Sequence, residues 1–213
     1  MRFKATLVSW QDIEDWCDAI REKIVGDYEP NVIIGLSRGG LVPARILSDK
    51  LWVKELISVK TEHWGITATK DGKAVLKTYG KPDLTGKRVL VVDDITDTGE
   101  SMRLAYDFVK SLNPLSVRTA TMLHVSRSSF VPDYYARYVD EKNWAWFIFP
   151  WNVYEDLDNL IGRSMSEPME TTEIREILLR DYGLDVSSLD MEKILRDFEN
   201  MGRIRRNGEV WVR

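Results

Sequence analysis

Short apolar runs alternate along the chain with segments in which apolar residues recur at helical spacing. The runs that have the length and β-branched content of buried strands lie at residues 32–36, 56–60, 89–92 and 115–123. Helices are predicted at about residues 9–24, 42–51 and 101–112, and a short edge strand at residues 1–8. Strands interleaved with helices in this way indicate an α/β fold.

The pattern changes near residue 155. Ser166-Glu167-Pro168 interrupts the chain, and two segments with helical apolar stripes follow, the last of them leading into residues that alternate around Asn207-Gly208. An Asn-Gly pair between alternating residues predicts a tight hairpin. We therefore expect a domain over residues 1–155 and a mainly helical extension over residues 156–213 that ends in a small hairpin.

Helices followed by a hairpin resemble part of a winged helix, so nucleic-acid binding is one function to consider for the extension. Residues 164–213 contain 8 Lys and Arg against 11 Asp and Glu, a net charge of 8 − 11 = −3. The local cluster Arg203, Arg205 and Arg206 is too small to reverse that sign. We expect an appendage that serves packing or supports a homodimer and that also borders the functional site of the first domain, and no nucleic-acid partner.

The composition is that of a globular protein: 213 residues, 44% hydrophobic and 30% charged, with a net charge of −4. This charge supplies no basic field for nucleic acid or for an anionic membrane. Cys17 is the single cysteine, so no internal disulfide can form, and it falls on the apolar face of a predicted helix, where we expect it in the core. No signal peptide or membrane-spanning segment is recognisable, so we expect a cytoplasmic protein.

Candidate chemistry begins where the strand at residues 89–92 ends. Asp93 and Asp94 follow the strand, and a hydroxyl-rich turn then leads into the next predicted helix. Backbone N–H groups point outward at such a helix start and favour a phosphate. The two carboxylates suit ribose hydroxyls, or a Mg²⁺ ion reached through water.

This segment resembles the 5-phosphoribosyl 1-pyrophosphate (PRPP) signature of the type I phosphoribosyltransferases. The resemblance implies a twisted parallel sheet flanked by helices, Mg²⁺ as cofactor, and PRPP bound by Asp93, Asp94, Thr96, Asp97, Thr98, Gly99, Glu100 and Ser101. Thr96 departs from the family, which more often has an aliphatic residue there.

A second loop follows the strand at residues 32–36. It consists of Ser37, Arg38, Gly39 and Gly40, in which the glycines let the backbone approach a ligand closely and Arg38 carries a permanent positive charge. An ordinary strand-to-helix turn would have the same shape. In the resembled family this is the pyrophosphate loop, so we expect Arg38 to stabilise the leaving group.

Residues 61–81 form a polar insertion too long for a simple connection, with a possible hairpin around Asp71-Gly72. The resembled family carries a mobile hood loop here, which would exclude water from the reaction. His63 lies in it and is expected to be a solvated loop residue.

The apolar run 144–151 resembles the base-binding segment of the 6-oxopurine phosphoribosyltransferases, and this likeness covers about residues 1–155. It implies a purine base stacked on Trp146 beside Phe147, although an aromatic core strand would look the same. Stacking accepts any planar base and cannot choose among purines.

The likeness breaks at Val125, which stands where the family typically has a lysine that donates to the purine 6-oxo group. An ammonium has donors and no acceptor, so its loss removes the main reason to prefer a 6-oxopurine. We therefore expect adenine to be favoured and AMP to be formed, with hypoxanthine, guanine or xanthine as the alternative. Asn152 also replaces an acid that often supports the metal and pyrophosphate.

The resemblance places Asp97 near purine N7, where it could take or share a proton. A helix N-cap is the other interpretation of the same residue, and both roles can coexist. A different class of function is a PRPP-sensing regulator whose C-terminal part binds DNA. The presence of Arg38, the predicted lid and Trp146 favours the enzyme.

Overall fold

The computed structural model describes residues 2–63, 74–77 and 82–213. The chain divides into two compact units, one made of Met1–Trp10 with Ala145–Arg213 and the other of Gln11–Trp144. The boundary of these units therefore differs from the expected one at residue 155, because the first residues of the chain and the run after Trp144 pair with each other. The functional boundary at residue 155 stays a prediction.

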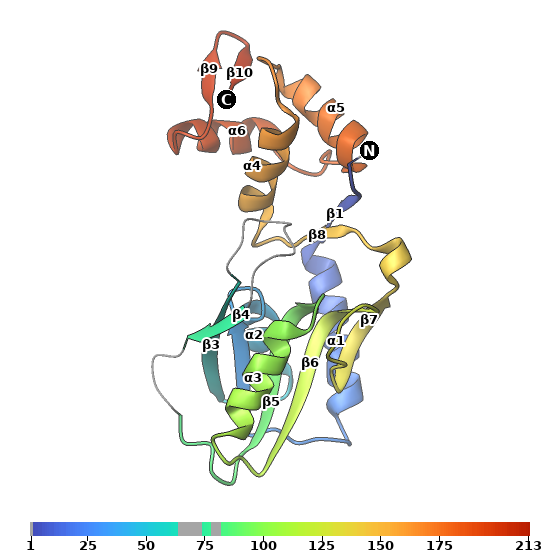
Figure 1. Cartoon of the computed structure of the whole chain (residues 1–213), viewed down its shortest axis with the longest axis vertical. Coiled ribbons are helices and arrows are strands. Elements are labelled where there is room, and N and C mark those ends of the chain that lie inside the picture. Colours follow the sequence, from blue (N-terminus) through green and yellow to red (C-terminus); the bar gives the residue numbers. More distant parts are fainter. Residues whose placement is uncertain (1, 64–73, 78–81) are drawn as a thin grey trace. The chain divides into compact units, whose positions relative to one another are not determined.

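The unit of residues 11–144 contains a six-stranded sheet in the order β4-β3-β2-β5-β6-β7 (Figure 1). In that order the strands are β4 (Ala74–Lys77), β3 (Glu55–His63), β2 (Val32–Ser37), β5 (Arg88–Thr96), β6 (Ser116–Val125) and β7 (Tyr134–Val139). All neighbours are parallel except β3 and β4, which are antiparallel. The predicted parallel α/β sheet is confirmed.

Helices cover both faces of this sheet: α1 (Trp10–Ile24), α2 (Leu41–Lys50) and α3 (Glu100–Lys110). On α3, Met102, Ala105 and Val109 pack in one apolar cluster with alternate residues of β2 and β5. On the opposite face, a Cβ added at Gly35 of β2 would lie 2.8 Å from the Cβ of Ala44 in α2. Figure 1 shows α3 in front of the sheet and α1 and α2 behind it.

The strands are buried on both faces, which explains their continuous apolar runs. Cys17 is fully buried on α1, as expected, and burial raises the pKa of its thiol to about 12. A thiol with that pKa is not a nucleophile at neutral pH.

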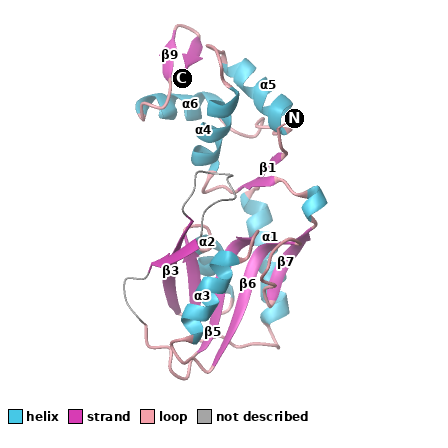
Figure 2. Cartoon of the chain, viewed as in Figure 1, coloured by secondary structure: helices cyan, strands magenta, loops and turns pink. Residues whose placement is uncertain are grey.

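The other unit holds a two-stranded parallel sheet, β1 (Ala5–Leu7) with β8 (Trp146–Ile148), and the elements that follow it. These are α4 (Val153–Ser164), α5 (Thr171–Tyr182), α6 (Met191–Asn200), β9 (Arg205–Asn207) and β10 (Val210–Val212), shown in Figure 2. The helical extension and its terminal hairpin are confirmed, with Gly208 in the turn at φ +64°. The apolar run at 144–151 is a strand only over three residues.

Most of the expected hood loop, including the hairpin turn at Asp71-Gly72, lies outside the described residues. Its described parts extend the sheet, because Thr61 and His63 at the end of β3 pair with Leu76 and Ala74 of β4. None of the helices in the described ranges is both long and apolar enough to cross a membrane.

Candidate functional site

The carboxylates of Asp93 and Asp94 lie near the C-terminal end of β5. Asp93 is 9% exposed, and its Oδ1 accepts a hydrogen bond from the N–H of Asp94 at 3.0 Å. Burial raises the pKa of Asp93 well above its usual value, and the negative charge of Asp94 raises it further. A cation or a hydrogen-bond donor at this position would therefore be strongly favoured.

The hydroxyl-rich turn leads directly from β5 into α3. Gly99 is the N-cap of α3 and has φ +83°, a left-handed conformation that glycine adopts without cost. The first N–H groups of a helix have no partner within it and carry the positive end of its dipole, so the start of α3 at Glu100 is electrostatically suited to an anion. The structure brings Asp97, Thr98, Gly99, Glu100 and Ser101 together at this helix start, and their role as a phosphate cradle stays a prediction.

The loop after β2 closes against the same carboxylates. A Cβ added at Gly39 would lie 1.9 Å from Oδ2 of Asp94, and one at Gly40 would lie 2.5 Å from the carbonyl oxygen of Val92. Only glycine fits at these two positions. Ser37 and Arg38, which are joined by a cis peptide bond, are thereby held next to the end of β5. The two loops that the sequence singled out are therefore neighbours.

The metal expected at Asp93 and Asp94 fits these residues in charge. Within the described ranges, no three His, Cys, Asp or Glu side chains come together as a metal site. A hard cation held by two carboxylates with substrate oxygens and water is the usual arrangement for Mg²⁺. The adjacent carboxylates of Asp93 and Asp94 suit that arrangement and not a metal cage built from protein alone.

A third loop, which the sequence did not single out, reaches the site from the end of β6. Its Arg127 donates two hydrogen bonds from Nη2 to the carboxylate of Asp97, the one to Oδ2 at 2.6 Å. The guanidinium also lies over the ring of Trp144, 4.8 Å from its centroid. The available signal in the sequence was the charge of Arg127, two residues after the end of β6, because β6 lies beside β5 in the sheet.

This third loop is attached to the turn at residues 97–101, which we call the phosphate turn after its predicted role. The N–H of Ser129 donates to the carbonyl oxygen of Thr98 at 2.9 Å, and its hydroxyl donates to the same oxygen at 3.0 Å. A Cβ at Gly99 would lie 2.5 Å from Oγ of Ser128. Any side chain at position 99 would therefore push the two segments apart.

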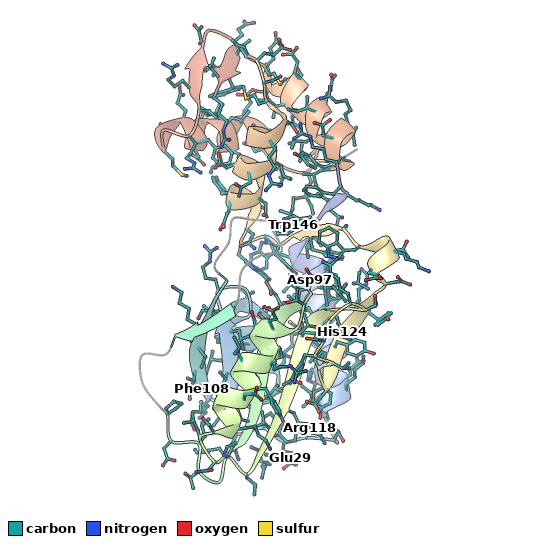
Figure 3. The ribbon with its side chains drawn as sticks, viewed as in Figure 1. Glu29, Asp97, Phe108, Arg118, His124 and Trp146 are labelled. Atoms are coloured by element: carbon teal, nitrogen blue, oxygen red, sulfur yellow. The ribbon has the colours of Figure 1, made fainter. Side chains whose placement is uncertain are left out.

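Beneath the site, Thr96 and His124 occupy paired positions on β5 and β6. The hydroxyl of Thr96 is 3.0 Å from Nδ1 of His124, and both side chains are buried. Burial lowers the pKa of His124, so the imidazole is neutral at pH 7. Thr96 thus takes part in a polar core contact that an aliphatic residue could not make. Figure 3 labels Asp97 and His124 toward one end of this unit and Arg118 at the other.

The residues expected to contact the base lie in different parts of the structure. Val125 is fully buried at the end of β6, and its carbonyl oxygen accepts from the N–H of Ser128 at 2.9 Å. Trp146 and Phe147 belong to β8, in the unit of residues 1–10 and 145–213. In that unit Trp146 donates a side-chain hydrogen bond to Asp156. Their roles toward a base stay predictions.

Comparisons with known proteins bear on the fold and the family. Residues 5–157 match the family model described as "Phosphoribosyl transferase domain". The solved structure of a purine phosphoribosyltransferase from Pyrococcus horikoshii is 32% identical, with a TM-score of 0.58, and the match covers 68% of this chain and 91% of that one.

Two curated relatives carry more specific names. A xanthine-guanine phosphoribosyltransferase of Idiomarina loihiensis is 28% identical over 147 residues, which cover 69% of this chain and 86% of that protein. A hypoxanthine-guanine phosphoribosyltransferase of Schizosaccharomyces pombe is 32% identical over 114 residues, 46% of this chain and 55% of that protein. The matches over residues 5–157 leave most of the C-terminal helices outside the family region.

Proposed function

The chain belongs to the phosphoribosyl transferase domain family, and from this premise we propose that it joins a 6-oxopurine base to PRPP. The products would be a nucleoside 5′-monophosphate and pyrophosphate. The observation that carries the proposal is the end of β5, where the buried carboxylate of Asp93 and the half-buried carboxylate of Asp94 precede a turn that opens α3 at Gly99. This arrangement offers hydrogen-bond acceptors to a ribose and backbone donors to its terminal phosphate.

The chain's own residues act by positioning and by charge. The turn at Thr98, Gly99 and Ser101 binds the 5′-phosphate, and Asp93 and Asp94 accept hydrogen bonds from the ribose hydroxyls. Arg38 and the Gly39–Gly40 amides hold the pyrophosphate, on which negative charge grows as the bond to the ribose C1 breaks. Donors fixed in place before the reaction stabilise that charge without reorganising.

Mg²⁺ is proposed as the cofactor because the adjacent carboxylates suit a hard cation. When bound, it would supply positive charge that stabilises the leaving pyrophosphate. Asp93 and Asp94 would hold it through water in this proposal, and the burial that raises the pKa of Asp93 favours a cation beside its carboxylate.

Two observations favour different bases as the substrate. The relatives are named for xanthine, hypoxanthine and guanine, which supports a 6-oxopurine. Adenine is the second candidate, and it is supported by Val125, a buried apolar residue where a lysine would donate to the 6-oxo group. A homodimer, a cytoplasmic location and an active-site role for residues 156–213 also stay predictions.

The deciding experiment measures turnover with PRPP and Mg²⁺ on a panel of adenine, hypoxanthine, guanine, xanthine and uracil. We expect hypoxanthine or guanine to have the highest kcat/KM. A clear preference for adenine would restore the second candidate. No turnover on any base, together with salt-sensitive binding to specific DNA in a mobility-shift assay, would support a PRPP-sensing regulator in place of an enzyme.

A variant tests the acid–base role proposed for Asp97. In Asp97→Asn we expect kcat to fall at least about 100-fold while the affinity for PRPP changes little, because general acid–base catalysis contributes factors of that size. Asp107→Asn, at an exposed position further along α3, is the matched control for loss of one negative charge. Unchanged turnover in Asp97→Asn would leave Asp97 only its structural role at the turn.

A further inference from the structure

Arg127 and Asp97 form a donor–acceptor pair at the end of two neighbouring strands. Both hydrogen bonds run from Nη2 of Arg127 to the carboxylate, and the side chains of Arg127 and Asp97 are 28% and 36% exposed. The pair is therefore open to solvent on one side. A small molecule that reached Asp97 from that side would meet the guanidinium next to it.

The position of Arg127 is set on three sides. Its guanidinium lies over the ring of Trp144. Two residues further on, the N–H of Ser129 donates a hydrogen bond to the carbonyl oxygen of Thr98 in the phosphate turn. Arg103 of α3 donates to the carbonyl oxygen of Ser129 at 2.8 Å and lies over Phe130. The loop is thus fastened to the phosphate turn, so a ligand bound at that turn finds Arg127 at a fixed place.

An acceptor beside a donor matches one edge of a 6-oxopurine. On that edge the five-membered ring carries N7 and the six-membered ring carries O6, and an arginine bound to these two atoms is the commonest specific contact with guanine in DNA. With the proton on N7, the base offers a donor to Asp97 and an acceptor, O6, to Arg127. Adenine offers an amino group in place of O6, and an arginine has no acceptor to receive it.

We infer that Arg127 is a specificity-determining residue that selects the 6-oxo group of the base, in the place of a lysine at position 125. This inference rests on the proposed function, because it requires the base to bind beside Asp97. It also explains how a chain with an apolar Val125 can share substrates with relatives named for 6-oxopurines. The positive charge that faces O6 comes from Arg127, two residues after Val125.

The test compares kcat/KM for hypoxanthine with kcat/KM for adenine in the wild type, Arg127→Ala, Arg127→Lys and Arg103→Ala. In Arg127→Ala we expect the hypoxanthine-to-adenine ratio to fall about 10- to 100-fold, the discrimination that a good side-chain contact to a base provides. Arg127→Lys keeps one charged donor and should give an intermediate ratio. It also serves as the folded variant if the alanine protein does not fold.

Arg103→Ala is the matched control, because it loosens the same loop and leaves the guanidinium at Asp97 in place. We expect it to change both substrates by the same factor and so to leave the ratio unaltered. An unchanged ratio in both Arg127 variants, or the same loss of ratio in Arg103→Ala, would overturn the inference while the enzyme still used 6-oxopurines. A wild type that uses no purine would instead reject the proposed function itself.

Discussion

The hydroxyl of Thr96 lies 3.0 Å from Nδ1 of His124, joining β5 to β6 directly beneath the acidic end of the sheet. Both side chains are buried, and the ring of His124 also packs against Tyr135 and Tyr138. A polar pair in an apolar layer is stable only while both members are partnered. The stability of the layer under the site therefore depends on both side chains keeping this contact.

Breaking the pair from the threonine side should cost stability. Thr96→Val keeps the shape and leaves His124 Nδ1 without this partner, and we expect a loss of about 1–3 kcal/mol in the free energy of unfolding. Urea denaturation at pH 7.5 measures it. The control is Thr98→Val, the same substitution at an exposed threonine. Thr119→Val is unsuitable as a control because the hydroxyl of Thr119 donates a hydrogen bond to Asp133. No loss in Thr96→Val would mean that water or another group replaces the hydroxyl.

His124 should also make stability depend on pH. Burial lowers the pKa of His124 in the folded state below the value of 6.5 for a free histidine. The unfolded chain therefore binds the proton more readily, and stability is lost as the pH falls through the unfolded pKa toward the folded one. Relative to His124→Gln, we expect the wild type to lose stability between pH 7.5 and pH 5. Parallel stability curves for the two proteins would contradict this.

Asp156 on α4 should make stability depend on pH in the opposite direction from His124. It is 4% exposed, its Oδ2 has no hydrogen-bond partner among the described residues, and burial raises its pKa to about 6. The folded state holds the proton more tightly, so stability is lost as the pH rises from the unfolded pKa through about 6. Between pH 4 and pH 7.5, we expect the free energy of unfolding of Asp156→Asn to rise by roughly 2 kcal/mol relative to that of the wild type.

Glu155→Gln is the control for Asp156→Asn, because it removes a neighbouring exposed carboxylate from the same turn of α4. Its stability relative to the wild type should stay nearly constant over that pH range. Chemical denaturation at four or five pH values gives both curves. A constant difference between Asp156→Asn and the wild type would show that Asp156 titrates normally.

Gly99→Ala should damage PRPP binding beyond its cost in backbone conformation. The added Cβ would lie 2.5 Å from Oγ of Ser128 and 2.7 Å from the backbone nitrogen of Phe130, so the loop after β6 must move. Gly86→Ala is the matched control, since Gly86 has φ +71° and a Cβ there meets nothing within 4 Å.

The positive φ alone costs about 1–2 kcal/mol in either glycine variant. We expect PRPP affinity, measured by calorimetry, to fall more than 10-fold in Gly99→Ala and to stay within about twofold in Gly86→Ala. Equal affinities in the two proteins would show that the contact between the loop and the phosphate turn is not needed for binding.

The C-terminal hairpin should depend on one buried carboxylate. Asp158 on α4 is 5% exposed and binds Arg203 and Arg213, the latter at 3.0 Å with a second hydrogen bond to the Asp158 carbonyl oxygen at 2.8 Å. Arg213→Met should destabilise the protein by about 1–3 kcal/mol, because it leaves part of a buried charge unpaired. Arg196→Met, at an exposed pair 4.0 Å long, should change stability by less than about 0.5 kcal/mol.

Local pattern was enough to predict β2, β3, β5 and β6, the helices and the two loops that follow β2 and β5, but not the two outer strands β4 and β7. Buried strands need continuous apolar runs, and the proposed phosphate turn was recognised from residues close together in the sequence, such as Asp94 and Gly99. The hairpin at Asn207-Gly208 was equally local. These features depend on a few neighbouring residues, so the sequence by itself was sufficient to predict them.

Tertiary structure alone decided which distant residues meet. The order of the sheet puts β6 beside β5, and only that neighbourhood brings Arg127 to Asp97 and His124 to Thr96. The pairing of β1 with β8 likewise draws the first residues of the chain into the unit that holds Trp146. Such contacts depend on burial and register summed over the whole fold, and no short stretch of sequence contains that information.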